Sequence, residues 1–146
     1  MPSESAVLVP RNTKQTGDET EARIIAALIE YDYSVSIPFG DNDRYDLIVD
    51  TESRLRRVQY KTGWVEDEVV RFKTASKTTV GGTVTLTDYG GDIDAFAVRC
   101  KDTDELYWVS LEAAGRKNTD LRLAEPEIDH SNVKRAEKYR FERRLP

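Results

Sequence analysis

The sequence predicts a mixed α/β domain, with a central sheet flanked by helices. Three observations support this class. An amphipathic helical segment comes early in the chain, short strand-like runs separated by turn residues fill the middle, and a basic helical segment lies near the end. The length of 146 residues fits one compact domain, and no internal repeat is visible.

The domain is expected to span residues 14–146, after a flexible arm at residues 1–13. The arm contains prolines and hydroxyl residues without an apolar period. Thr16 or Asp18 could cap a first helix that runs to about residue 31. The apolar residues of this helix recur at helical spacing, at Ile24, Ile25, Leu28 and Ile29.

Strand-like runs rich in β-branched and aromatic residues follow this helix. They are expected at 34–37, 45–50, 55–62, 69–74, 93–100 and 106–111. Short polar connections at 51–53 and 101–104 predict two hairpins. Residues 76–91 are expected to be mostly loop, with a short strand at 84–86. A helical turn is expected within 111–116. A last helix, capped by Ser131 or Asn132, is expected over 133–141.

The charge balance is acidic, with a formal net charge of -5 and a pI near 5.0. This argues mildly against a nucleic-acid partner. Two segments are locally basic, however. Residues 71–77 hold three cations and no acid, and residues 134–144 hold six cations and two acids. Local basic patches on an otherwise acidic protein therefore remain an alternative interpretation.

Several other classes find no support in the sequence. No apolar run approaches the roughly 20 residues of a membrane span, and no secretory signal is visible, so we expect a cytoplasmic protein without a membrane partner. Cys100 is the only cysteine, which we expect to be a buried thiol rather than a nucleophile. With His130 as the only histidine, neither a Cys/His zinc site nor a Ser-His-Asp triad is supported. No phosphate loop or dinucleotide glycine motif is present.

Glu21 is the first residue that could carry chemistry. It precedes Ile24, Ile25 and Leu28 by three, four and seven residues, so it shares their helix face and points toward the sheet. A carboxylate that faces a core is unfavourable unless it is paired or binds a cation. The alternative is a carboxylate at the edge of the core that reaches water.

Asp46, Gln59 and Lys61 form a second group, on two neighbouring strands. Asp46 begins the apolar run 47–49, and Gln59 and Lys61 share one strand face, opposite Val58. Each residue alone is equally typical of a solvated strand. Together with Glu21 they would provide hard oxygen ligands for Mg²⁺ and a lysine beside the attacking water, which favours phosphodiester hydrolysis.

Several segments resemble the PD-(D/E)XK nuclease superfamily, and most closely its endonucleases associated with group I introns. The segments are Gly-Asp-Glu-Thr-Glu-Ala at 17–22, Pro-Phe-Gly-Asp-Asn-Asp-Arg-Tyr-Asp-Leu at 38–47, Arg-Val-Gln-Tyr-Lys-Thr-Gly at 57–63, and the stretches 89–96 and 106–109. The resemblance covers about residues 14–140. It implies a restriction-endonuclease-like core and an endonuclease activity on duplex or branched DNA. Archaeal Holliday junction resolvases share this core.

The resemblance also implies roles for the matched residues. Asp46 would be the central metal ligand, with Gln59 and the Tyr60 main-chain carbonyl as further ligands. Glu21 would bind the metal directly or through water, and Lys61 would act on the nucleophilic water. Mg²⁺ is the expected ion, with Mn²⁺ as a substitute.

Two positions depart from the superfamily pattern. Tyr45 stands where the superfamily name has proline, and Gln59 replaces the commoner glutamate. The intron-associated group also carries glutamine there, although a neutral amide lowers the negative charge of the site. An inactive DNA-binding or assembly module with the same fold is therefore the alternative function.

DNA contacts and assembly follow from the same reasoning. Cutting two strands with one site per chain favours a homodimer or homotetramer. Residues that flank the site and could contact DNA are Lys14, Arg44, Thr62, Lys73 and Lys77. The basic segment 134–144 is expected to be an exposed helix face.

Overall fold

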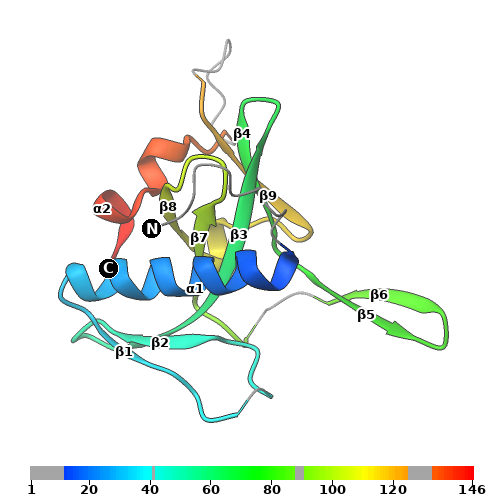
Figure 1. Ribbon diagram of the computed structural model, residues 1–146, viewed down its shortest axis with the longest axis horizontal. Coiled ribbons are helices and arrows are strands. Elements are labelled where there is room, and N and C mark those ends of the chain that lie inside the picture. Colours follow the sequence, from blue (N-terminus) through cyan, green and yellow to red (C-terminus); the bar gives the residue numbers. More distant parts are fainter. Residues whose placement is uncertain (1–11, 41, 88–90, 125–132) are drawn as a thin grey trace, which may run out of the picture.

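The computed structural model describes residues 12–40, 42–87, 91–124 and 133–146, with the side chains of 76–80 and 84–87 outside the description. It contains a seven-stranded sheet and a separate two-stranded sheet. One long helix crosses the face of the larger sheet (Figure 1). Within the described residues, no helix is both long and apolar enough to cross a membrane.

Helix α1 (Thr13–Glu30) begins earlier than the sequence predicted. Its cap is Asn12, whose side chain accepts the Gln15 N–H at 2.8 Å, while the Gln15 side chain accepts the Asn12 N–H at 3.1 Å. This reciprocal capping box satisfies N–H groups at the start of the helix. The cap is therefore Asn12 and not, as the sequence predicted, Thr16 or Asp18. The end of the predicted arm is therefore part of the helix, and residues 1–11 lie outside the described part.

The strands occur mostly where the sequence predicted them. The bounds are β1 (Ser34–Ser36), β2 (Leu47–Asp50), β3 (Leu55–Glu66), β4 (Val69–Lys73), β7 (Ala95–Cys100) and β8 (Leu106–Ser110). The predicted hairpins β2–β3 and β7–β8 are both present.

Strand β3 is the centre of the sheet. On one edge it pairs with β7 in parallel, from Val58 to Gly63. On the other edge it pairs first with β2, at 55–58, and then with β4, at 64–66. The close approach of β4 explains Gly63, because a Cβ there would lie 3.1 Å from the Arg71 carbonyl oxygen and from Val70 Cγ1.

One prediction for the middle of the chain was wrong in part, and one strand was missed. Residues 76–91 were expected to be mostly loop with a short strand at 84–86; that strand is present within β6 (Thr83–Thr87), but it pairs with β5 (Ser76–Val80) in a hairpin that projects from the body at the right of Figure 1. The signal was Gly81-Gly82, both with positive φ, between β-branched runs, which is a sequence typical of a two-residue turn. Strand β9 (Asn118–Arg122) was missed, although Thr119 and Leu121 alternate with exposed residues.

The C-terminal region is less helical than predicted. The turn after β8 is a 3-10 helix, η1 (Leu111–Ala113). The expected helix over 133–141 is replaced by a 3-10 helix, η2 (Ala136–Tyr139), and a single α-helical turn, α2 (Phe141–Arg144). Its proposed caps, Ser131 and Asn132, lie outside the described residues.

The sheet is buried on both faces, which gives the protein two apolar cores. The core on the α1 side contains Ile24, Leu28, Val58, Ala95 and Ala97, and the core on the opposite side contains Val70, Phe72, Phe96, Val98 and Leu121. Strand β7 alternates between them, with its small alanines under the helix. Cys100 is a buried free thiol, as expected.

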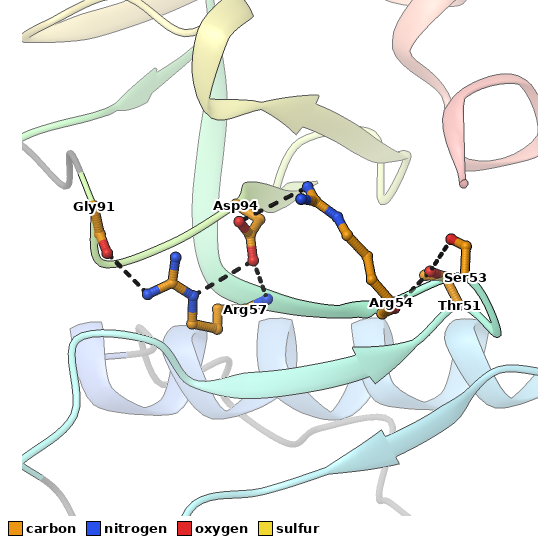
Figure 2. Close-up of polar contacts among 6 residues, drawn as sticks. All are labelled: Thr51, Ser53, Arg54, Arg57, Gly91 and Asp94. Atoms are coloured by element: carbon orange, nitrogen blue, oxygen red, sulfur yellow. Dashed lines mark hydrogen bonds and ion pairs between the residues drawn. The ribbon is translucent and has the colours of Figure 1, made fainter.

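Asp94, directly before β7, fastens this strand to β3. Figure 2 shows it between two arginines: its carboxylate accepts the Arg57 N–H at 2.8 Å and Arg57 Nε at 3.4 Å, and lies 3.9 Å from Arg54. Arg57 also donates to the Gly91 carbonyl at 2.8 Å. Burial opposes the charge of Asp94, but the hydrogen bonds and charges of Arg57 and Arg54 outweigh it and lower its pKa. These contacts fix the register of β3 two residues before Gln59.

We predict that Asp94→Asn lowers the free energy of unfolding by about 1–2 kcal/mol at pH 7, because the charge-assisted bonds are lost. A lowered carboxyl pKa contributes stability that is present above 3.8 and disappears as the pH falls below it. The difference should therefore shrink at pH 3. Urea unfolding at both pH values measures it, with Glu112→Gln on the exposed surface of η1 as a control. Equal stability of wild type and Asp94→Asn at pH 7 would contradict the assignment.

Candidate active site

Asp46 lies where the pairing of β2 with β3 ends. The last paired residues are Leu47 and Val58, and the Asp46 N–H donates to the Val58 carbonyl at 2.8 Å. Its carboxylate oxygen Oδ2 then accepts the Tyr60 N–H at 2.9 Å. A side chain thus replaces the backbone acceptor that a longer β2 would supply, and this fixes the Asp46 carboxylate against the strand.

This arrangement opens a gap in one edge of β3. Strand β2 ends its pairing at Val58, and β4 begins its pairing at Trp64. Since the N–H and C=O of one residue point to the same strand edge, the Tyr60 carbonyl is directed to the same side as the Asp46 carboxylate. The two groups that the resemblance implies as metal ligands, the Asp46 carboxylate and the Tyr60 carbonyl, therefore lie on the same edge of β3.

Glu21 reaches the same place from α1. Its Oε2 accepts a hydrogen bond from the Tyr60 hydroxyl at 3.1 Å. Burial, followed by the negative charges of Asp46 and Glu21, raises the pKa of Tyr60 above its ordinary value, so the phenol remains a donor. The position of Glu21 on the inner face of the helix, beside the buried Ile24, agrees with the prediction from helical spacing.

Asp46 is unusual among the acids in the described part of the chain because its pKa is raised to about 6. Burial is the largest cause, and the negative charge of Glu21 adds to it. The hydrogen bond from Tyr60 and the positive charge of Lys61 act in the opposite direction. Two carboxylates and a lysine therefore interact electrostatically at one edge of the sheet, which is typical of a functional site.

Gln59 and Lys61 lie on the other face of β3. They pair with Phe96 and Val98 of the second core, whereas Tyr60 pairs with Ala97 of the α1 core. The Gln59 amide donates a short hydrogen bond to the Arg44 carbonyl. The amide nitrogen thus holds the loop that precedes Asp46, which a glutamate could not do.

A cleft of about 300 Å³ gathers part of the predicted site. Asp46 and Glu21 line it, while Gln59 and Lys61 do not. No role was predicted for the remaining lining side chains, although most fall within the segment 38–47 that resembles the intron-associated endonucleases. The full lining is Glu21, Ile37, Pro38, Gly40, Asp43, Tyr45, Asp46 and Tyr60.

The cleft offers a small set of oxygen donors to a divalent cation. Among the residues that the structure describes, no group of three or more His, Cys, Asp or Glu side chains is placed to hold a metal. The available ligands are two carboxylates, Glu21 and Asp46, with the Tyr60 carbonyl beside them. All are hard oxygen donors of the kind that Mg²⁺ prefers, and the mutual repulsion of the two acids would be relieved by a cation. The residues present fit such an ion.

The proposed DNA-contacting residues differ in their surroundings. Arg44 forms an ion pair with Asp92 at 2.8 Å, and the Thr62 hydroxyl is hydrogen-bonded to the buried Thr20 at 2.5 Å. Lys14, in the first turn of α1, and Lys73, at the end of β4, are both exposed. The side chain of Lys77, on β5, lies outside the described part.

The raised pKa of Asp46 predicts a pH-dependent cost in stability. Between about pH 4 and pH 6 the folded protein binds a proton that the unfolded chain has released, so stability falls as the pH rises through this window. Without divalent ions, Asp46→Asn should equal wild type at pH 4 and exceed it by about 1–2 kcal/mol at pH 7.5, after allowance for solvent screening. Urea unfolding checks this, and parallel pH profiles would contradict it.

Gln59→Glu provides a separate test of the bond to Arg44. A carboxylate facing the Arg44 carbonyl has no proton to donate, so we expect a loss of about 1–3 kcal/mol in unfolding free energy at pH 8. The loss should diminish near pH 4, where a protonated glutamate can donate again. Chemical denaturation at the two pH values measures both effects. A variant as stable as wild type at pH 8 would show that this hydrogen bond does not hold the loop.

Two comparisons with known proteins give matches that bear on the family and the fold. A family model described as PD-(D/E)XK endonuclease matches residues 11–142. Among solved structures, that of the bacterial homing endonuclease I-Ssp6803I is similar, with a TM-score of 0.72 and 23% identity over 90% of each chain; at this identity the likeness shows the fold alone. Comparison with curated proteins gives no match. The predicted fold is therefore confirmed, and because the family model spans nearly the whole chain, the protein belongs to the PD-(D/E)XK endonuclease family.

Proposed function

We propose that this protein is a Mg²⁺-dependent endonuclease that hydrolyses phosphodiester bonds in DNA, with Mn²⁺ as a substitute ion. The observation that carries the proposal is the meeting of Glu21 and Asp46 in one cleft at the open edge of β3, with the Asp46 pKa raised to about 6. Family membership supports nuclease activity and the use of a divalent ion.

Four groups are proposed to serve the ion. Asp46 and the Tyr60 carbonyl would hold it, and Glu21 would bind directly or through water. The Gln59 amide oxygen is proposed as the fourth ligand, and its side chain would have to reach the ion from the other face of β3. When bound, the ion supplies positive charge that stabilises the developing negative charge on the phosphate. Tyr60 serves Glu21 as well, since its hydroxyl fixes one carboxylate oxygen and leaves the other for a ligand.

Lys61 is proposed to orient the attacking water or to accept its proton. The lysine is half-buried on β3, on the same strand as Tyr60, and its positive charge acts to lower the pKa of Asp46. A positioned acid–base group of this kind contributes about 10²–10⁴-fold to a rate.

The substrate is proposed to be duplex DNA, cut site-specifically. Support comes from the similar structure of I-Ssp6803I, a homing endonuclease, and from the intron-type sequence segments. A single site per chain would cut one strand, so cleavage of both strands requires a homodimer or homotetramer. Branched DNA, as cut by a junction resolvase, is the second candidate substrate.

A binding or assembly module without useful catalysis is the competing function. The observation in its favour is Gln59, which brings no negative charge to the site and uses its amide nitrogen on Arg44. The net charge of -5 also disfavours strong DNA binding. Catalysis itself is the measurement that separates the two.

A cleavage assay tests the proposal. In Mg²⁺, a pool of randomised duplexes and a four-way junction are incubated with wild type, Asp46→Ala, Lys61→Ala and the control Lys117→Ala, an exposed lysine between η1 and β9. We expect wild type and Lys117→Ala to cut, Lys61→Ala to lose about 100-fold or more in rate, and Asp46→Ala to be inactive. Binding of Lys61→Ala in Ca²⁺ should remain close to wild type.

The outcomes separate the functions. Equal cutting by all four proteins would refute the site assignment. Binding without cutting by any of them, across salts and substrates, would establish the binding module. Preferential cutting of the junction would replace the intron-type assignment by a resolvase.

A further inference from the structure

The loop between β1 and β2 exposes apolar side chains beside the cleft. Phe39 has 105% relative exposure and Ile37 has 60%, so the Phe39 ring lies wholly in water. Isolated exposed apolar residues are common on protein surfaces. Two exposed apolar side chains within three residues at the rim of the candidate cleft are less common. Covering them with a partner is favourable, because it removes apolar surface from water.

This loop is also a wall of the cleft. Ile37, Pro38 and Gly40 line the same cavity as Asp46, whereas Phe39 does not line it. The phenyl ring therefore lies outside the cavity, on a segment whose neighbours face into it. In Figure 1 the loop extends beyond the edge of the sheet, below β2.

The backbone of the loop is constrained at several points. Pro38 has a fixed φ, and Gly40 adopts a φ of +87°, which disfavours any other residue there. Further along, the Arg44 carbonyl accepts the hydrogen bond from Gln59, and the Arg44 side chain pairs with Asp92 at 2.8 Å. Phe39 is thus presented by a loop that is anchored to the sheet.

From these observations we infer that Ile37 and Phe39 form an apolar wedge that unstacks a base step of duplex DNA beside the phosphate held in the cleft. The inference rests on the proposed function. Successive phosphates on a strand are about 3.4 Å apart along the helix axis, so nucleotides adjacent to a bound phosphate must pass over this rim. Phenylalanine, isoleucine and proline are the residue types that proteins insert between base steps.

A second copy of this chain is the other occupant to consider for the loop. One phenylalanine and one isoleucine fall well short of the roughly 800 Å² that each partner buries in a standard protein interface, because a large aromatic side chain covers about 150–250 Å². The wedge also lies directly at the cleft where the substrate must bind. These two arguments favour DNA.

The wedge predicts a sequence preference that arises from how easily a base step unstacks, without hydrogen bonds to base edges. Pyrimidine–purine steps such as TA and CA/TG unstack most readily, so the cleaved phosphate should lie beside such a step. Sequencing the products of the randomised pool shows whether this enrichment occurs.

The direct test uses a duplex that carries 2-aminopurine at the step beside the cut, bound in Ca²⁺. Wild type should raise its fluorescence, and Phe39→Ala should lose most of this rise and weaken binding roughly tenfold, as expected for one lost aromatic–base stack. Phe39→Leu should recover part of both effects. Leu55→Ala is the matched control, because Leu55 is 61% exposed at the start of β3, on the opposite side of the paired region from the cleft.

A second substrate separates unstacking from a loss of folding. If the wedge opens a base step, a mismatch placed at that step should restore cleavage by Phe39→Ala toward the wild-type rate, because the unstacking is already complete. A misfolded variant would not be rescued. A fluorescence rise and cleavage rate equal to wild type in Phe39→Ala would overturn the inference, as would an altered sedimentation mass that accounts for its loss of activity.

Failure of the proposed function gives a different result. If wild type cuts no DNA in Mg²⁺, the endonuclease assignment fails. Duplexes that carry 2-aminopurine at each step in turn, bound in Ca²⁺ by wild type and Phe39→Ala, then still decide whether Phe39 unstacks a base.

Discussion

The hydrogen bond from the Tyr60 backbone to the Asp46 carboxylate is the interaction on which the candidate site depends. A strand edge requires acceptors for its N–H groups, and at this point β2 has ended while β4 has not begun. Asp46 supplies the missing acceptor with its side chain. The same bond therefore completes the sheet locally and holds a carboxylate beside the Tyr60 carbonyl.

The rest of the fold supports this one position. Asp94 joins β3 to β7 through Arg57, and this sets the register in which Tyr60 pairs with Ala97 of the parallel strand β7. Helix α1 packs its inner face on the small alanines of β7, and this brings Glu21 to the Tyr60 hydroxyl. A change in the register of β3 by one residue would exchange the faces of Tyr60 and Lys61 and would disassemble the site.

The site is held in a form that opposes its own stability. Asp46 and Glu21 are two acids brought together with partial burial. Burial and the charge of Glu21 disfavour the ionised form of Asp46, and its pKa is raised for this reason. Such an arrangement becomes favourable when a cation joins it, which is the expected behaviour of a metal site and not of a structural ion pair. Phe39 is comparable, because its fully exposed ring buries no apolar surface in the fold and so adds nothing to its stability. The proposed metal site and the proposed wedge thus use groups at one rim that the fold itself does not stabilise.

The sequence by itself determined the family, the helical face of Glu21 and the alternation of Gln59 and Lys61 against Tyr60, because these depend on local periodicity and on short motifs. It also predicted six of the nine strands in the described residues, whose β-branched runs carry a strong signal, and part of a seventh, β6. It did not reveal β9, β5 and its hairpin with β6, or the short C-terminal helices, where polar residues and the glycine pair weaken the pattern. Only the tertiary structure decided that Glu21 and Asp46 share a cleft while Gln59 turns to Arg44, and that Phe39 has no partner within the described fold. The physical reason is that these contacts join segments 15 to 39 residues apart, and their geometry is set by strand register and helix packing rather than by local sequence.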